Sequence, residues 1–127
     1  MRAYFDLDVL IWHLRGELRA LNFLRKLRES GEYDLWIGAM QRVEIVFFMK
    51  PHEEEGTLMF LSQFKTAPVN QDVVDAAGVL YRRWRSSPGV DVNDAILAAT
   101  AMLTGGQVFT LNKKHYPMPD LIVKKAW

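Results

Sequence analysis

Hydrophobic and polar residues follow two different periods along the chain, and their pattern predicts the secondary structure. Short apolar runs between turn residues predict strands, and longer segments with apolar residues three or four positions apart predict helices. Strands are expected at residues 3–6, 34–37, 66–69, 107–111 and 121–125. Helices are expected at residues 7–14, 17–29, 39–49, 53–64, 71–85 and 92–104. Strands that alternate with helices favour a mainly parallel sheet covered on both faces, which is an α/β fold.

The helix expected at 39–49 differs from the others because it is apolar nearly all round. Only Gln41, Arg42 and Glu44 interrupt its hydrophobic surface. A helix of this kind is typically buried. We therefore expect it to lie in the interior, partly against another subunit.

Composition narrows the class of protein. A chain of 127 residues is the size of one domain, so a single domain over residues 1–127 is expected. The absence of cysteine excludes disulfides, thiol catalysis and cysteine-based metal sites. The apolar runs at 45–49 and 95–103 are too short to span a bilayer, and the first residues lack the layout of a secretory signal. These features predict a soluble cytoplasmic protein.

The distribution of charge gives only a weak indication of function. The formal net charge is only +1, but the basic residues are clustered, at residues 15–28, 82–85, 113–114 and 124–125. Such clusters can contact the phosphate backbone of a nucleic acid. They are equally expected on solvated helix faces, so both interpretations stay open.

Two acids near the start are the first candidates for chemistry. Asp6 comes directly after the first expected strand, and Asp8 follows in the next helix. Ligands of parallel sheets bind beyond the carboxyl ends of the strands, although Asp6 could also simply cap the helix. The spacing is similar to the D-x-D motif of haloacid dehalogenase-type phosphatases. That motif usually continues with Gly, whereas Val9 and Leu10 follow here, so the phosphatase interpretation is disfavoured.

Other acids are expected at the same end of the sheet. Glu44 lies on the apolar helix, where an unpaired carboxylate would be costly to bury. Asp91 and Asp94 lie at the start of the helix at 92–104, where either could be a capping residue. Carboxylates at 6, 44 and 94 that converge would repel one another, and a bound divalent cation is the usual solution. Oxygen ligands without cysteine favour Mg²⁺ or Mn²⁺.

Three segments carry a family resemblance that spans nearly the whole chain. FDLDVLIWHLRG, MQRVEIVF and GVDVNDAILAATAMLTGGQVFTLNKKHYP occur in the order of the conserved blocks of the PIN-domain family, and in particular of VapC toxins. The resemblance implies a three-layer α/β/α fold. It also implies that Asp6, Glu44 and Asp94 bind the metal and activate water, with Asp8 supporting the first turn. Asp91 is a further candidate ligand that the family pattern does not require.

The end of the third segment resembles the family turn T-x-N-x-x-D-F through Thr110 and Asn112. The turn then departs from the pattern, because His115 replaces the acid and Tyr116 follows. The position of the family's fourth acidic ligand therefore carries no acid, which favours one metal ion over two. His115 could contact phosphate, titrate near neutral pH or pack in the turn.

The resemblance implies a metal-dependent endoribonuclease that acts as the toxin of a toxin–antitoxin pair. RNA is then the substrate, and a VapB-like antitoxin and a second copy of the chain are the expected partners. The helices at 39–49 and 53–64 are the candidate contact surfaces. The alternative is a catalytically idle PIN-like module that binds RNA or a protein, because His115 replaces an acid.

Overall fold

The computed structural model describes all 127 residues. The strands are β1 (Arg2–Phe5), β2 (Asp34–Gly38), β3 (Lys65–Ala67), β4 (Gln107–Thr110) and β5 (Val123–Lys125). The helices are α1 (Leu7–Leu14), α2 (Leu18–Ser30), α3 (Ala39–Phe48), α4 (Glu54–Leu61), α5 (Gln71–Trp84) and α6 (Val92–Thr104), with the short 3-10 helices η1 (Pro51–Glu53) and η2 (Lys113–His115). Each strand and helix that the sequence pattern predicts is confirmed, with ends that shift by a few residues at most. None of the helices is long and apolar enough to cross a membrane.

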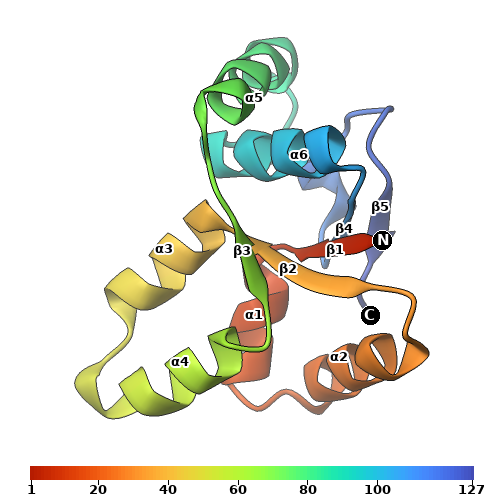
Figure 1. Cartoon of the computed structure of the whole chain (residues 1–127). Helices are drawn as coiled ribbons and strands as arrows, with labels where there is room; N and C mark the ends of the chain where they lie inside the picture. The colour runs from red at the N-terminus through yellow and green to blue at the C-terminus, as the bar shows by residue number, and fades with distance from the viewer.

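The five strands form one parallel sheet in the order β3-β2-β1-β4-β5. In the central strand, Ala3 pairs with Leu35 of β2 on one side and with Gln107 of β4 on the other. The chain first adds strands on one side of β1 and then continues on the other side, so the strand order reverses between β1 and β4 (Figure 1). The carboxyl ends of strands at such a reversal are where open parallel sheets bind ligands.

Helices cover both faces of this sheet. Figure 1 shows α1, α2 and α4 on one face and α6 on the other, with α5 packed outside α6. Neighbouring residues of a strand point to opposite faces, so Phe5 belongs to the core beneath α1 and α2, and Tyr4 to the core beneath α6. This arrangement confirms the three-layer α/β/α fold and makes the sheet entirely parallel.

The expectation that the helix at 39–49 is buried is wrong for the isolated chain. In α3 only Gln41 and Ile45 are buried, whereas Phe47 and Phe48 are 73% and 80% exposed. The reason is its position, because α3 begins where β2 ends and extends past the edge of the sheet (Figure 1). Only one stripe of the helix therefore meets the core, and its other apolar side chains face outward.

Several segments are shorter than predicted, and two of them show why. The strand expected at 66–69 ends at Ala67, because Pro68 has no N–H to donate to a neighbouring strand. The helix expected at 53–64 begins with the 3-10 turn η1 and ends at Leu61, after which Phe64 still packs in the core.

Candidate metal site

Asp6 is the first residue after β1, and its carboxylate is held from two sides. Oδ1 accepts a hydrogen bond from the Leu7 N–H at 2.8 Å, so Asp6 is the N-cap of α1. Oδ2 accepts a hydrogen bond from Thr110 Oγ1, at the end of β4, at 2.9 Å. The residue is only 6% exposed. Asp6 is therefore a helix cap and, at the same time, a buried and firmly oriented carboxylate at the reversal of strand order.

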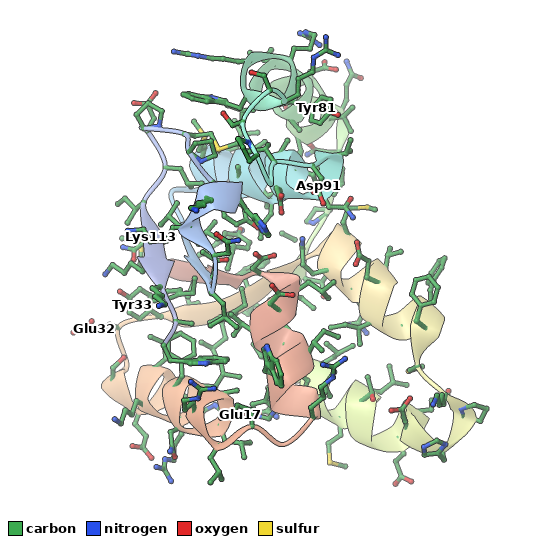
Figure 2. The ribbon with its side chains drawn as sticks, turned by 180° about the vertical axis from the view of Figure 1, so that it is seen from behind. Glu17, Glu32, Tyr33, Tyr81, Asp91 and Lys113 are labelled. Atoms are coloured by element: carbon green, nitrogen blue, oxygen red, sulfur yellow. The ribbon has the colours of Figure 1, made fainter.

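Asp94 reaches the same place from the first turn of α6. Its N–H donates to Asp91 Oδ1 at 2.8 Å, and its Oδ2 accepts from the Asp91 N–H at 3.0 Å. This reciprocal capping box fixes the orientation of the Asp94 side chain, which is 6% exposed. Asp91 is exposed, and its side chain caps the amino end of α6. Figure 2 labels Asp91 at this start of the helix.

His115 is the third side chain of the cluster. Its Nδ1 lies 3.8 Å from Asp6 Oδ2 and 4.0 Å from Asp94 Oδ1. One potential ligand atom from each of these three residues lies within 4.8 Å of the others. Gly89 supports the ring from the other side: its φ is +89°, and a Cβ there would lie 2.7 Å from His115 Cδ2. A side chain at position 89 would therefore displace the imidazole.

The turn between β4 and η2 places this histidine. The Asn112 N–H donates to Thr110 Oγ1 at 3.1 Å, and Asn112 Oδ1 accepts from the Lys114 N–H at 3.1 Å. Asn112 Nδ2 lies 3.3 Å from His115 Nε2. Thr110 thus orients Asp6, and Asn112 shapes the turn that carries His115. Lys113, which begins η2, is labelled in Figure 2.

Glu44 lies outside this cluster. The side chain is half-buried on α3, and its Oε1 accepts a hydrogen bond from Asn93 Nδ2 at 2.5 Å. Asn93 precedes Asp94 in α6, so Glu44 is connected to the cluster through a neighbour. The sequence led us to expect Glu44 as the third converging group, and His115 takes that place in the compact cluster. A metal-binding role for Glu44 stays a prediction.

Asp8 does not join the cluster either. It is exposed in the first turn of α1 and makes no side-chain hydrogen bond. A negative charge in the first turn of a helix interacts favourably with the helix dipole. This position agrees with a supporting role in the turn.

The two buried carboxylates have little positive charge nearby. No lysine or arginine forms an ion pair with Asp6, Asp94 or Glu44, and His115 is the only basic side chain in contact. Burial raises the pKa of Asp94 to about 7, and the negative charges of Asp91 and Asp6 act in the same direction. A hydrogen bond from the Asp91 backbone and the charge of His115 oppose this rise in pKa.

This donor set fits a divalent cation. Two carboxylates and one imidazole nitrogen lie within reach of a single ion, and a cation would relieve both the burial and the mutual repulsion of the acids. Carboxylate oxygens suit Mg²⁺ and Mn²⁺, and imidazole is a common ligand of transition metals. The residues present therefore fit Mn²⁺ through all three donors and Mg²⁺ through the carboxylates.

Three residues of this site were not predicted from the sequence. Asn93 contacts Glu44, Gly89 supports His115, and Tyr116 places a buried hydroxyl near Asp6. Tyr116 carried a usable signal, because the family turn has Phe at this position and the extra hydroxyl calls for an explanation. Asn93 and Gly89 carried none, since their contacts depend on how distant segments pack.

Comparison with known proteins establishes the class to which this fold and site belong. Residues 3–121 match the family described as PIN domain. The chain therefore belongs to the PIN domain family, which confirms the resemblance seen in the sequence.

Individual relatives within the family give a more specific comparison. The chain is 34% identical over 114 residues to Ribonuclease VapC10 of Mycobacterium tuberculosis (strain ATCC 25618 / H37Rv), covering 89% of this chain and 84% of the relative. It is 34% identical over 118 residues to Ribonuclease VapC19 of the same strain, covering 91% and 94%. A solved toxin–antitoxin complex from Klebsiella pneumoniae contains a chain with a TM-score of 0.79 and 27% identity, with 98% of each chain covered.

Proposed function

We propose that this protein is a Mg²⁺- or Mn²⁺-dependent endoribonuclease of the VapC type, which hydrolyses phosphodiester bonds of RNA as the toxin of a toxin–antitoxin pair. The observation that carries the proposal is the cluster of Asp6, Asp94 and His115 at the reversal of strand order, with no lysine or arginine paired to the acids. The identity of 34% to two proteins named ribonucleases supports the substrate class. We propose the cytoplasm as the place of action, because cellular RNA is found there.

In this proposal Asp6 and Asp94 hold the cation. When bound, a divalent cation can lower the pKa of a water and neutralise charge on a phosphodiester. Thr110 and the Leu7 N–H fix the orientation of Asp6, and the capping box with Asp91 fixes Asp94. His115 offers a nitrogen donor within 4.0 Å of both acids, and Glu44 adds a further carboxylate that is hydrogen-bonded to Asn93, the neighbour of Asp94 in α6. The chain thus contributes a firmly oriented and negatively charged cluster.

Basic side chains around the site are suited to bind the RNA backbone. Lys113 and Lys114 belong to the same short helix as His115. The last turn of α5 carries Arg82 and Arg83, and the segment that follows leads to Gly89, which contacts His115. Contacts of this kind bind phosphates and fix the register of the strand without reading its sequence.

A VapB-like antitoxin and a second copy of the chain are the proposed partners. A groove of about 640 Å³ lies between α1, α3 and α4, with Glu44 and Glu53 among its lining residues. Its apolar lining, which includes Ile45 and Phe60, suits an apolar segment of an antitoxin. Its charged lining contains Arg15 as well as the two carboxylates, and so suits charged side chains of either sign. The exposed Phe47 and Phe48 extend this apolar surface and favour a contact between subunits.

Two observations favour the alternative of a catalytically idle module. His115 takes the place of an acid in the family turn, and Glu44 lies outside the compact cluster. Such a module would bind RNA or a protein partner without cutting.

Cleavage of a structured RNA with added Mn²⁺ tests the proposal, with Asp6→Asn as the comparison. We expect cleavage by the natural chain and its loss in the variant, because the buried carboxylate is needed to hold the cation. Equal cleavage by both proteins would remove Asp6 from the site. Tight RNA or partner binding with no cleavage by either protein would support the idle module.

A further inference from the structure

The basic cluster at residues 15–28 has no part in the proposed function, although two of its arginines line a cavity. This cavity, of about 320 Å³, lies where α1, α2 and the turn after α4 meet, on the face of the sheet opposite α6 (Figure 1). Its charged lining consists of His13 from α1 and of Arg25 and Arg28 from α2, and no acidic residue lines it. The cavity therefore gathers basic groups, as the candidate metal site gathers acidic ones.

Both arginines of this cavity are oriented by neutral partners. Arg28 Nη2 donates a hydrogen bond to Gln63 Oε1, in the turn that follows α4. Arg25 Nη2 donates to Oδ1 of Asn22, three residues earlier in α2, at 2.9 Å. Gln63 and Asn22 line the same cavity. The two guanidinium groups are thus positioned at the cavity without losing their charge to an acid.

His13 adds a basic group from the last turn of α1. Its imidazole is half-buried and stacks on the Phe60 ring, with the ring centroids 4.3 Å apart. Burial lowers the pKa of His13, and the positive charge of Arg28 lowers it further, while a backbone hydrogen bond acts in the opposite direction. An anion bound between the two groups would remove this unfavourable effect.

None of the three basic groups has an acidic partner. Arg19 with Glu17 is the only ion pair of an arginine or lysine in the chain. Guanidinium groups bind phosphate oxygens through charge-assisted hydrogen bonds that are often bidentate. The helix that carries the two arginines is itself strongly basic, with Arg19, Arg25, Lys26 and Arg28 against Glu29 alone. A continuous basic helix of this kind favours the phosphates of a nucleic acid.

We propose that Arg25, Arg28 and His13 form a phosphate-binding site that takes a phosphodiester group of the RNA away from the bond that is cut. The RNA in this inference rests on the proposed function, whereas the affinity for phosphate rests on the cavity alone. Asp6 caps the first turn of α1 and His13 lies in its last turn, roughly 10 Å further along the helix. A phosphate held there fixes the register of the strand relative to the acids without reading its sequence.

Arg19 provides a matched control for Arg28. It is exposed on the same helix, does not line the cavity and is paired with Glu17 at 2.9 Å. A change from Arg to Gln removes one positive charge at either position. Effects that the two variants share therefore report the general charge of the helix, and effects confined to Arg28→Gln report the cavity.

The experiment compares the natural chain, Arg28→Gln and Arg19→Gln in EDTA, so that no RNA is cut. Fluorescence anisotropy gives the Kd for a short labelled single-stranded RNA, and thermal unfolding gives the Tm in inorganic phosphate and in chloride of equal ionic strength. We expect phosphate to raise the Tm of the natural chain and of Arg19→Gln, and this increase to be lost in Arg28→Gln. We also expect RNA binding by Arg28→Gln to be about tenfold weaker, with a salt dependence of log Kd lower by about one unit.

Three results would overturn the inference. Equal weakening of RNA binding in both variants would show general surface charge and no site. An increase in Tm with phosphate that Arg28→Gln abolishes, combined with unchanged RNA binding, would show that the cavity takes free phosphate and not RNA. Tight binding of a polyglutamate peptide that Arg28→Gln abolishes, again with unchanged RNA binding, would assign the cavity to an acidic protein partner.

The proposed function is tested separately from this inference, because these measurements use neither metal nor cleavage. RNA cleavage by the natural chain with Mn²⁺, together with any of the three results, would overturn the inference and leave the proposed function standing. RNA binding that depends on Arg28, without cleavage in Mn²⁺, would support the phosphate site and count against the nuclease.

Discussion

The two ends of strand β1 meet the same helix, α6, in opposite ways. At the amino end the Tyr4 hydroxyl is paired with both Thr104 and Arg2, and the Arg2 guanidinium lies 3.7 Å from the centroid of the Trp36 ring. At the carboxyl end, Asp6 and Asp94 face each other with only His115 as a basic neighbour. One end pairs its polar groups, and the other gathers like charges.

This difference separates a stabilising region from a functional one. Polar groups that are paired where they are buried support the fold, whereas uncompensated buried charges destabilise it. Local conflicts of the second kind are expected at functional sites, where a ligand resolves them. Gly106 at the amino end fits the first category, because a Cβ there would lie 2.5 Å from the ring of Tyr4 and would disturb the paired network.

The largest effect is expected when one of the facing charges is removed. Asp94→Asn keeps an oxygen to accept from the Asp91 N–H and loses the negative charge. We expect RNA cleavage with Mn²⁺ to fall on the order of a hundredfold or more, while the metal-free Tm stays the same or rises because repulsion is relieved. Cleavage assays and thermal unfolding check the two parts. Wild-type cleavage by this variant would contradict the assignment of Asp94.

The pH dependence of stability is the second expected effect. The pKa of Asp94 is about 7 in the folded chain and 3.8 in its ordinary state, so between these values the folded state binds more protons than the unfolded state. The contribution of Asp94 to metal-free stability therefore falls as pH rises from about 4 to about 7. A cation prefers the ionised carboxylate, so the increase in Tm caused by Mn²⁺ should grow over the same window.

Thermal unfolding with and without Mn²⁺ at about pH 5 and about pH 8 measures this dependence. The Asp94→Asn variant is the control, because it lacks the titrating carboxyl group and should lose most of the pH dependence of the Mn²⁺ effect. An increase in Tm that is the same at both pH values in the natural chain would show that Asp94 does not control the affinity of the site.

A smaller effect is expected at the contact between Glu44 and Asn93. If the Asn93 amide holds Glu44 toward the cluster, Asn93→Ala should weaken Mn²⁺ binding about tenfold, since a hydrogen bond to a charged group contributes about 1.5–3 kcal/mol. Glu44→Gln should weaken binding as well, and the double variant should add little to either single change. Asn22→Ala is the control, because the only side-chain hydrogen bond of Asn22 is with the exposed Arg25. Fully additive effects would show that Asn93 does not act through Glu44.

The sequence predicted the order and type of the elements because their signals are local. The Asn70 cap and the glycine at position 105, which has a φ of +69°, mark helix ends without reference to the rest of the chain. The burial of α3 was mispredicted because burial depends on where a helix meets the sheet. Apolar residues such as Phe47 look the same in the sequence whether a core or another protein covers them.

The residues of the candidate site could be predicted from the sequence to the same degree as the fold. Asp6 and Asp94 could be singled out because each lies at the end of a predicted strand or the start of a predicted helix, and the structure brings them together. The position of Glu44 outside the cluster could not be predicted, because it follows from the packing of α3 against α6. The orientation of His115 depends on Gly89, which is distant in the sequence and carries no chemical signal of its own.

The smallest effect is expected at the amino end of β1, where Thr104→Val tests the other side of the comparison. The substitution keeps the shape of the side chain and removes one partner of the Tyr4 hydroxyl, while the bond from Arg2 remains. We expect a loss of about 1 kcal/mol in the free energy of unfolding, measured by urea denaturation, with no change in Mn²⁺ affinity or RNA cleavage. A change in Mn²⁺ affinity would show that the two ends are coupled through α6. Unchanged affinity together with lower stability would show that the paired end supports the fold and leaves the chemistry to the other end.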